Sequence, residues 1–152
     1  MCNALRIEEI GGDKKQYLPL LIIGDESERM IDRYIADSDL FIGFIDEKPI
    51  AACAAMDIDD STVEIKNLAV DPMYRRQGIG GRMLEHVEAV NRQKMIILGT
   101  GETPSTLRFY AGCGYTYSHR IPDFFTDNYP DEIVEEGITL HDMVYLKKNA
   151  AD

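Results

Sequence analysis

The sequence lacks the features that mark secreted and membrane-spanning proteins. Its three cysteines, Cys2, Cys53 and Cys113, are scattered and form no Cys-x-x-Cys pair, so they indicate neither a zinc site nor a redox dithiol. The longest apolar runs are far shorter than the ~20 residues that a membrane span needs. Met1 begins an acidic segment rather than a basic and then apolar leader. We therefore expect a cytoplasmic protein with no membrane partner.

Positive charge is also scarce. Lys and Arg number 16 against 27 Asp and Glu, which gives the 152-residue chain a formal net charge of -11. A chain this acidic repels the phosphates of nucleic acids, so we expect no nucleic-acid partner. Small cationic amines are attracted instead.

Hydrophobic periodicity predicts strands and helices in a definite order. Strands are expected where apolar and polar residues alternate or a short run is wholly apolar, and helices where apolar residues recur every three or four positions. The expected strands are 5–10, 39–46, 49–59, 61–70, 94–100, 115–121 and 138–146. The expected helices are 17–23, 25–37, 79–92 and 103–112. No repeat or linker interrupts this order, so we expect a single domain over residues 1–152.

The helices carry further signals. Asp25 and Glu28 have the spacing of a capping box at a helix start. The apolar side of the later helix is formed by Ile79, Met83, Val87 and Val90. Because the strands are mixed with helices along the chain, the sequence predicts an α/β fold of the α+β mixed-sheet type, with helices on both faces of the sheet.

The stretch "RRQGIGG", residues 75–81, combines glycines with the start of a helix. Gly78, Gly80 and Gly81 let the backbone turn tightly and leave its N–H groups unshielded by side chains. The N-terminus of a helix adds a partial positive charge at the same place. Both properties favour binding of a phosphate or pyrophosphate.

Two common phosphate-binding motifs do not fit this stretch. A Walker loop needs a Gly-Lys pair, and the sequence has none. A dinucleotide-binding Gly-x-Gly-x-x-Gly would need glycine where the chain has Met83. P-loop and NAD chemistry are therefore not indicated.

The pattern Arg75-x-x-Gly78-x-Gly80 follows the strand end "NLAVDP", and "FYAGCGY" lies further along at 109–115. These segments resemble the acyl-CoA-binding motif and the later Phe-Tyr-x-x-x-Gly-Phe segment of the GNAT superfamily of N-acetyltransferases. The resemblance extends from Leu5 to Leu146 and is to small, single-domain, bacterial-type members. It implies the GNAT fold, a central, mostly antiparallel sheet whose fourth and fifth strands splay apart. Here "EIKNLAV" and "MIILGTG" would be those strands.

The resemblance also implies a cofactor, acetyl-CoA. Its pyrophosphate would lie on the backbone amides of residues 77–81, with charge added by Arg75 or Arg76. Main-chain groups of 68–70 would hold the pantetheine arm, and the Leu68 amide would polarise the thioester carbonyl. Many GNAT members have an Asn before the Tyr-bearing helix, where this chain offers Thr103 or Ser105. The implied cofactor-binding residues are Leu68, Ala69, Val70, Arg75, Arg76, Gln77, Gly78, Ile79, Gly80, Gly81, Thr103 and Ser105.

Tyr110 and Glu64 are the catalytic candidates. Acetyl transfer needs a base that accepts a proton from the amine and an acid that protonates the leaving thiolate. By the resemblance, Tyr110 would be the acid and Glu64 the base. Alternatively, Tyr110 is a packed core residue and Glu64 a solvent-facing strand residue. Simple alternation puts Glu64 on one face with Lys66 and Leu68, and Val63, Ile65 and Asn67 on the other.

The segment 121–137 is long for a connection and is rich in acidic and aromatic residues. Phe124, Phe125 and Tyr129 are candidate substrate-binding residues, because aromatic rings and carboxylates together hold a cationic amine. The alternative is a solvated loop whose aromatic residues close the core or form a homodimer contact. The sequence leaves both open.

The motifs favour an acetyl-CoA-dependent N-acetyltransferase that transfers an acetyl group to the primary amine of a small molecule. The amine would attack the thioester directly, so no covalent nucleophile is needed, and no metal site is predicted. Two alternatives stay open: a non-catalytic acyl-CoA-binding or sensor module, and a protein N-terminal acetyltransferase.

Overall fold

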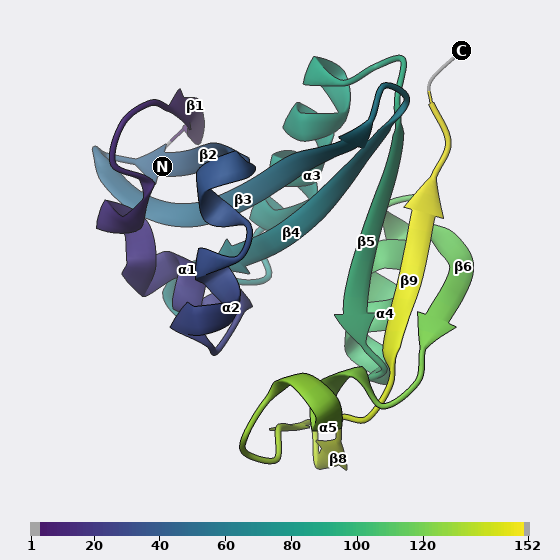
Figure 1. The fold of residues 1–152 in the computed structure, drawn as a ribbon. Coiled ribbons are helices and arrows are strands. Elements are labelled where there is room, and N and C mark those ends of the chain that lie inside the picture. The colour runs from purple at the N-terminus through teal and green to yellow at the C-terminus, as the bar shows by residue number, and fades with distance from the viewer. Residues whose placement is uncertain (1–3, 151–152) are drawn as a thin grey trace.

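The computed structural model describes residues 4–150, so Cys2 lies outside the described residues. Its main sheet has the strand order β1-β2-β3-β4-β5-β9-β6, and β7 and β8 form a separate hairpin (Figure 1). Strands β4 and β5 pair in parallel, whereas the other neighbours in the main sheet are antiparallel. The predicted mixed sheet is confirmed.

The observed elements follow the predicted order, with extra structure inside the long connection. The strands are β1 (Arg6–Ile10), β2 (Asp39–Ile45), β3 (Lys48–Asp59), β4 (Thr62–Val70), β5 (Met95–Gly101), β6 (Thr116–Ile121), β7 (Val134–Glu135), β8 (Ile138–Thr139) and β9 (Met143–Lys148). The α-helices are α1 (Leu18–Gly24), α2 (Glu28–Asp32), α3 (Ile79–Val90), α4 (Pro104–Gly112) and α5 (Phe124–Asn128). Three short 3-10 turns cover Lys14–Tyr17, Ile35–Asp37 and Pro72–Tyr74.

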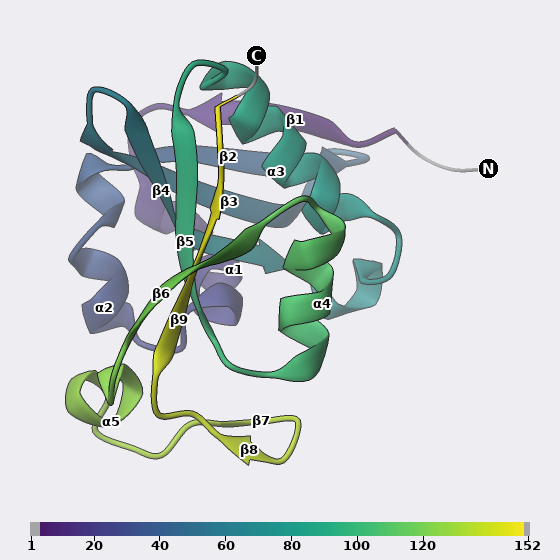
Figure 2. The same cartoon turned by 90° about the vertical axis from the view of Figure 1, so that its right-hand side faces the viewer.

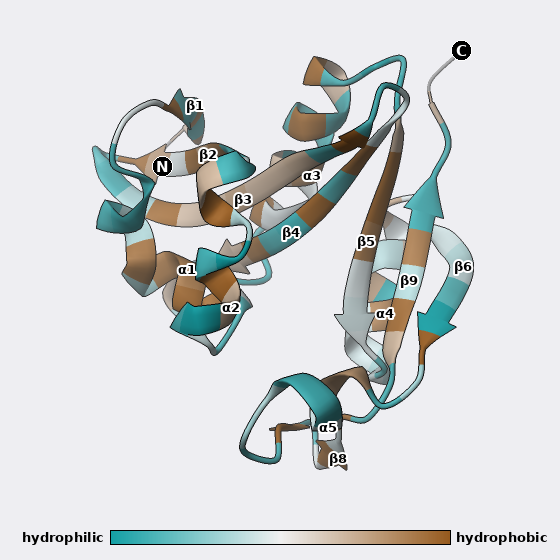
Figure 3. Ribbon diagram, in the orientation of Figure 1, coloured by the Kyte–Doolittle hydropathy of each residue, from teal (hydrophilic) through white to brown (hydrophobic). Residues whose placement is uncertain are grey.

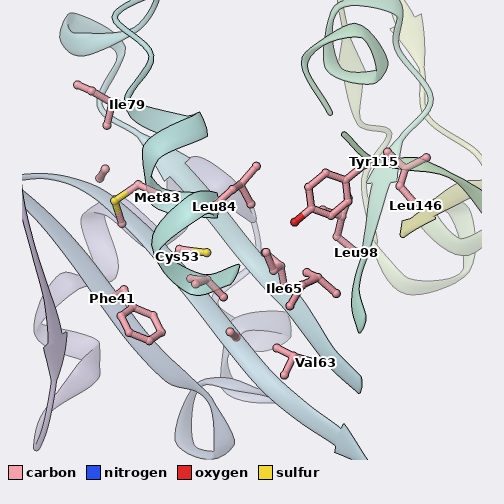
Figure 4. Packing of buried hydrophobic residues seen from close by; sticks show 14 of the residues in the cluster. Phe41, Cys53, Val63, Ile65, Ile79, Met83, Leu84, Leu98, Tyr115 and Leu146 are labelled. Carbon is pink, nitrogen blue, oxygen red and sulfur yellow. The ribbon is translucent and has the colours of Figure 1, made fainter. Parts of the chain in front are cut away.

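Helices α3 and α4 cover one face of the sheet, and α1 and α2 cover the other (Figure 2). On the α3 side, Met83 and Leu84 pack against strand residues that include Cys53 and Ile65 (Figure 4). The predicted apolar side of α3 is correct except at Val90, which is 56% exposed. Val90 is the last residue of the helix, and Leu84 is fully buried as well, so the buried side of α3 is wider than predicted.

Helices α1 and α2 are short and separated by a corner at 25–27. The Ser27 side chain caps α2 by accepting a hydrogen bond from the Met30 amide at 3.2 Å. Asp25 instead ends α1, so its predicted capping role at α2 is wrong. Ser27 takes the capping position, and Asp25 Oδ1 instead accepts a hydrogen bond from the Ser27 amide at 3.3 Å.

Strand β4 contains a β-bulge at Lys66. The pairing with β3 passes from Ala55–Ile65 directly to Ala54–Asn67, so Lys66 is an extra residue. Beyond the bulge, Leu68 packs with the α3-side core, whereas Asn67 bonds to groups on the α1 side. The predicted faces of Asn67 and Leu68 are therefore wrong, because one inserted residue reverses the alternation of side chains.

Strands β4 and β5 separate just where the bulge begins. They pair over Thr62–Ile65 and Met95–Leu98, and their later residues diverge (Figure 1). The paired start of β5 is strongly apolar, but its end consists of Gly99, Thr100 and Gly101 (Figure 3). The predicted splay of the fourth and fifth strands is thus confirmed, and within residues 4–150 it leaves the edge of β4 beyond Ile65 without a strand partner.

Asn67 ties the bulge to the end of α1. Its Nδ2 donates to the Leu21 carbonyl oxygen at 2.9 Å and to the Tyr34 hydroxyl at 3.1 Å. Its Oδ1 has no hydrogen-bond partner within residues 4–150 and lies against Gly24. The position of β4 along the splayed edge therefore depends on this contact with α1.

Replacing Gly24 with alanine should lower the thermal unfolding midpoint. A Cβ there would collide with Asn67 Oδ1 and lie 3.0 Å from the Leu68 carbonyl oxygen. Overpacking of this kind costs about 1–3 kcal/mol. Gly11→Ala is the control, because a Cβ at Gly11 meets open space. Calorimetric melting that gives the two variants equal midpoints would contradict the tight contact.

Candidate functional site

A cavity of about 640 Å³ occupies the wedge between the diverging strands. Residues 65–70 of β4 form one wall and 98–101 of β5 the other. One end is bounded by the turn before α3, and the other by the corner after α1 and by parts of the segment between β6 and β9. Regions distant in sequence therefore meet around one space, as expected of a ligand-binding site.

The glycine turn presents free backbone amides at one end of the cavity. Arg76 and Gly78 have positive φ angles of 64° and 77°, so both residues adopt the left-handed backbone conformation. The amide of Arg82 donates to the Gly78 carbonyl oxygen at 3.1 Å, which starts the α3 ladder. The N–H groups of 79–81 precede that ladder and have no helical acceptor. Such a concave turn at a helix start binds anions.

Most residues expected to bind the cofactor line this cavity. They are Leu68, Ala69, Val70, Arg75, Arg76, Gly78, Ile79, Gly80 and Ser105. Within the described part of the chain, Gln77, Gly81 and Thr103 lie outside the lining. Thr103 is 1% exposed, and its hydroxyl donates to the Thr106 hydroxyl at 2.9 Å. Thr106, like Ser105, does line the cavity.

Tyr110 lines the cavity on the α4 side. Its ring makes edge contacts with Phe109 and Tyr115 at centroid distances of 5.0 and 5.9 Å. Burial raises the pKa of the Tyr110 hydroxyl, so the group stays protonated at neutral pH. A protonated phenol beside a cavity can give its proton to an anion formed there.

Glu64 belongs to the part of β4 that pairs with β5, and it lies outside the described cavity lining. It is 8% exposed, accepts a hydrogen bond from the Tyr145 hydroxyl at 2.9 Å and forms an ion pair with Lys66 at 3.2 Å. The solvent-facing alternative for Glu64 is therefore wrong. Its role as a base stays a prediction, and both carboxylate contacts would compete with it.

Burial raises the pKa of the Cys113 thiol, which disfavours the reactive thiolate. No three His, Cys, Asp or Glu side chains within residues 4–150 are grouped closely enough to hold a metal ion.

The opposite end of the cavity is lined by Asp25, Phe125 and Tyr129. The Tyr129 hydroxyl donates to Asp25 Oδ1 at 2.8 Å, and the Tyr34 hydroxyl donates to Asp25 Oδ2 at 3.2 Å. Phe124 lies outside the described lining but packs edge-on against Phe125 at 5.3 Å. The long connection thus bridges back to the corner after α1.

Sequence reasoning missed Asp25 and Asn67. Asp25 was interpreted as a helix cap, and Asn67 as a core-facing strand residue. The Tyr129–Asp25 contact spans 104 positions, which short-range patterns do not report. The one available signal was an amide side chain at an expected buried strand position, since buried amides need hydrogen-bond partners.

One cavity thus combines a turn of backbone amides suited to an anion, a wedge between splayed strands and a protonated tyrosine. This combination is typical of an enzyme that binds a phosphate-bearing cofactor. Residues 36–117 match the family described as the acetyltransferase (GNAT) domain. The chain therefore belongs to the GNAT acetyltransferase family, as its resemblance predicted. None of the helices described within residues 4–150 is long and apolar enough to cross a membrane.

Relatives cover nearly the whole chain. The uncharacterized N-acetyltransferase YvbK of Bacillus subtilis is 28% identical over 148 residues, which cover 93% of this chain and 94% of that protein. A GNAT family acetyltransferase from Elizabethkingia anophelis, solved with acetyl-CoA bound, matches with a TM-score of 0.89 and 30% identity over 95% of this chain and 97% of its own. A Bacillus subtilis acetyltransferase in complex with CoA matches with a TM-score of 0.85 and 26% identity over 96% and 99%.

Proposed function

We propose that this protein is an acetyl-CoA-dependent N-acetyltransferase that acetylates the primary amine of a small molecule. The observation that carries the proposal is the single cavity shared by the amide turn, the free edge of β4 and the Tyr110 ring. The solved relatives that hold acetyl-CoA and CoA support the choice of cofactor.

The residues present fit a CoA thioester. Amides at the start of α3 suit the pyrophosphate, and Arg75 and Arg76 at the cavity supply positive charge. The bound cofactor would supply the acyl group as an activated thioester. Backbone groups of 68–70 on the unpaired edge of β4 are available to an extended arm, as an added strand would use them.

Tyr110 and the backbone of β4 would each assist one part of the acetyl transfer. A thiolate leaving group needs a proton, and Tyr110 holds one because burial raises its pKa. The Leu68 amide would stabilise charge on the thioester oxygen. Glu64 would accept the amine proton only through water or after a shift, since Tyr145 and Lys66 already contact its carboxylate.

Contacts at the α1–α2 end of the cavity favour a small acceptor over a protein N-terminus. Tyr129 bonds to Asp25, and the Arg29 guanidinium donates to the Asn128 carbonyl oxygen at 3.4 Å. Both contacts join the end of α5 to the α1–α2 corner. A peptide acceptor would need an open groove where these contacts bridge the site.

We further propose that residues 1–152 act as one domain in the cytoplasm. One sheet unites both hydrophobic clusters, which supports a single folding unit. The free thiols of Cys53 and Cys113 suit a reducing compartment.

A thiol-release assay tests the activity. Purified protein is incubated with acetyl-CoA and a panel of primary amines, and free CoA thiol is followed against protein-free controls. We expect amine-dependent thiol release together with an N-acetylated product detected by mass spectrometry. CoA binding without turnover on any amine would favour a sensor module, and turnover confined to peptides would favour an N-terminal acetyltransferase.

A further inference from the structure

We propose that Asp25 binds the acceptor, as the carboxylate that receives its ammonium group and so selects cationic amines. This inference rests on the proposed function and names the residue and the charge state that would govern acceptor binding.

Asp25 stands beside the backbone expected to hold the thioester. It directly follows Gly24, whose added Cβ would lie 3.0 Å from the Leu68 carbonyl oxygen. The corner after α1 is therefore packed onto the same stretch of β4 that would hold the thioester. A group bound by Asp25 would lie on the acceptor side of that stretch.

The Asp25 carboxylate is oriented by three neutral donors, of which the Ser27 amide donates to Oδ1 at 3.3 Å. Tyr129 donates to Oδ1 and Tyr34 donates to Oδ2, at 2.8 and 3.2 Å. Burial raises the pKa of both phenols, so they remain protonated and donate hydrogen bonds without neutralising the carboxylate. Oδ1 already accepts two hydrogen bonds, whereas Oδ2 accepts only that of Tyr34 and retains a lone pair for a further donor.

The negative charge of Asp25 has no ion-pair partner among residues 4–150. Lys66 also lines the cavity, but its ammonium pairs with Glu64 at 3.2 Å. A half-buried carboxylate held by neutral groups and lacking a cation favours a cationic ligand.

A second oxygen nearby points to the same ligand. Asn67 lines the cavity and is 3% exposed, yet its Oδ1 has no donor within the described chain. This oxygen lies against Gly24, next to Asp25 in sequence. A positive charge close by would offset the cost of leaving it without a hydrogen bond.

Aromatic rings complete the surroundings of the proposed ammonium. Phe125 and Tyr129 line the cavity with centroids 5.7 Å apart. Ring faces beside a carboxylate are a favourable setting for an ammonium group. Before attack the bound ammonium would lose one proton to water, and transfer of the acetyl group would then leave the second proton on the CoA thiol. The amide product is neutral, so its attraction to Asp25 would be lost, which would aid release.

The test measures acceptor binding, separately from the thiol-release assay of turnover. Calorimetry on the CoA-loaded protein would compare butylamine with butanol, and phenethylamine with phenethyl alcohol. Wild-type protein should bind each amine at least about 30-fold more tightly than the matching alcohol, the size expected for a desolvated charge contact. Asp25→Asn should remove most of this ratio, and Asp25→Glu should retain a clear part of it.

Asp127→Asn is the matched control, because it removes one negative charge from exposed α5 outside the described cavity lining. It should leave the amine-to-alcohol ratio unchanged. Equal weakening of amine and alcohol by Asp25→Asn, or an unchanged ratio, would overturn the proposal, and so would a wild-type ratio near one. If the wild-type protein bound amines selectively but acetylated none of them, the proposed enzyme activity would be wrong. The proposal that Asp25 binds the ammonium group would still hold.

Discussion

Gly80→Val should abolish CoA binding while the protein remains folded. A Cβ at Gly80 would lie 3.1 Å from Phe109 Cζ and 3.8 Å from Val70 Cγ2, at the wall of the cavity. The two further methyl groups of valine would cover amides that precede the α3 ladder. Losing these charge-assisted hydrogen bonds should raise the Kd for CoA at least about 100-fold.

Isothermal titration with CoA measures this effect. Gly112→Val is the control, since a Cβ at Gly112 meets nothing within 4 Å and the residue lies outside the described lining. Circular dichroism would establish that both variants fold. If Gly80→Val bound CoA as tightly as Gly112→Val, the amide turn would not be the CoA pyrophosphate site.

Tyr110→Phe should lower kcat about 100-fold, because general acid–base groups contribute about 100-fold to 10,000-fold. The phenyl ring keeps the contacts with Phe109 and Tyr115, so the Kd for CoA should change less than about twofold. The loss should therefore fall on the chemical step, measured as the initial rate at saturating acetyl-CoA and amine.

Tyr115→Phe is the control for Tyr110→Phe. The Tyr115 hydroxyl donates to Glu88 Oε2 at 2.9 Å, away from the cavity lining of the described chain. Its removal should cost some stability and leave kcat near the wild-type value. Equal rates for the two variants would exclude Tyr110 as the acid and leave it a packing residue.

The sequence predicts the fold well where local patterns and tertiary packing agree. The apolar repeat through Met83 and Val87 specifies a helix that must cover a sheet, and this helix is α3. The glycines at 78 and 80 predict the phosphate-binding turn, because positive φ and close approach of a ligand both need a missing side chain.

The bulge at Lys66 is the main feature that the sequence conceals. Nothing in the residue types of β4 marks an inserted position, because its register depends on pairing with β3. Asn67 and Leu68 were consequently assigned to the wrong faces. This single register shift moves the amide side chain toward α1, where it can anchor the splayed edge.

The acceptor side was predicted only in part for a similar reason. Aromatic residues in 121–137 indicated a binding segment, and Phe125 and Tyr129 do line the cavity. Asp25 has the same local pattern as any helix cap, so only its long-range contacts with Tyr34 and Tyr129 distinguish it.

The side of the cavity around Asp25 and Tyr129 belongs to segments outside the main sheet. The α1–α2 corner and the stretch between β6 and β9 contribute no strand to the main sheet, although Gly24 before the corner packs against Asn67 and Leu68 of β4. If the acceptor binds at this end as proposed, exposed substitutions in these two segments would change acceptor choice, while the turn before α3 proposed to bind the thioester donor would stay the same.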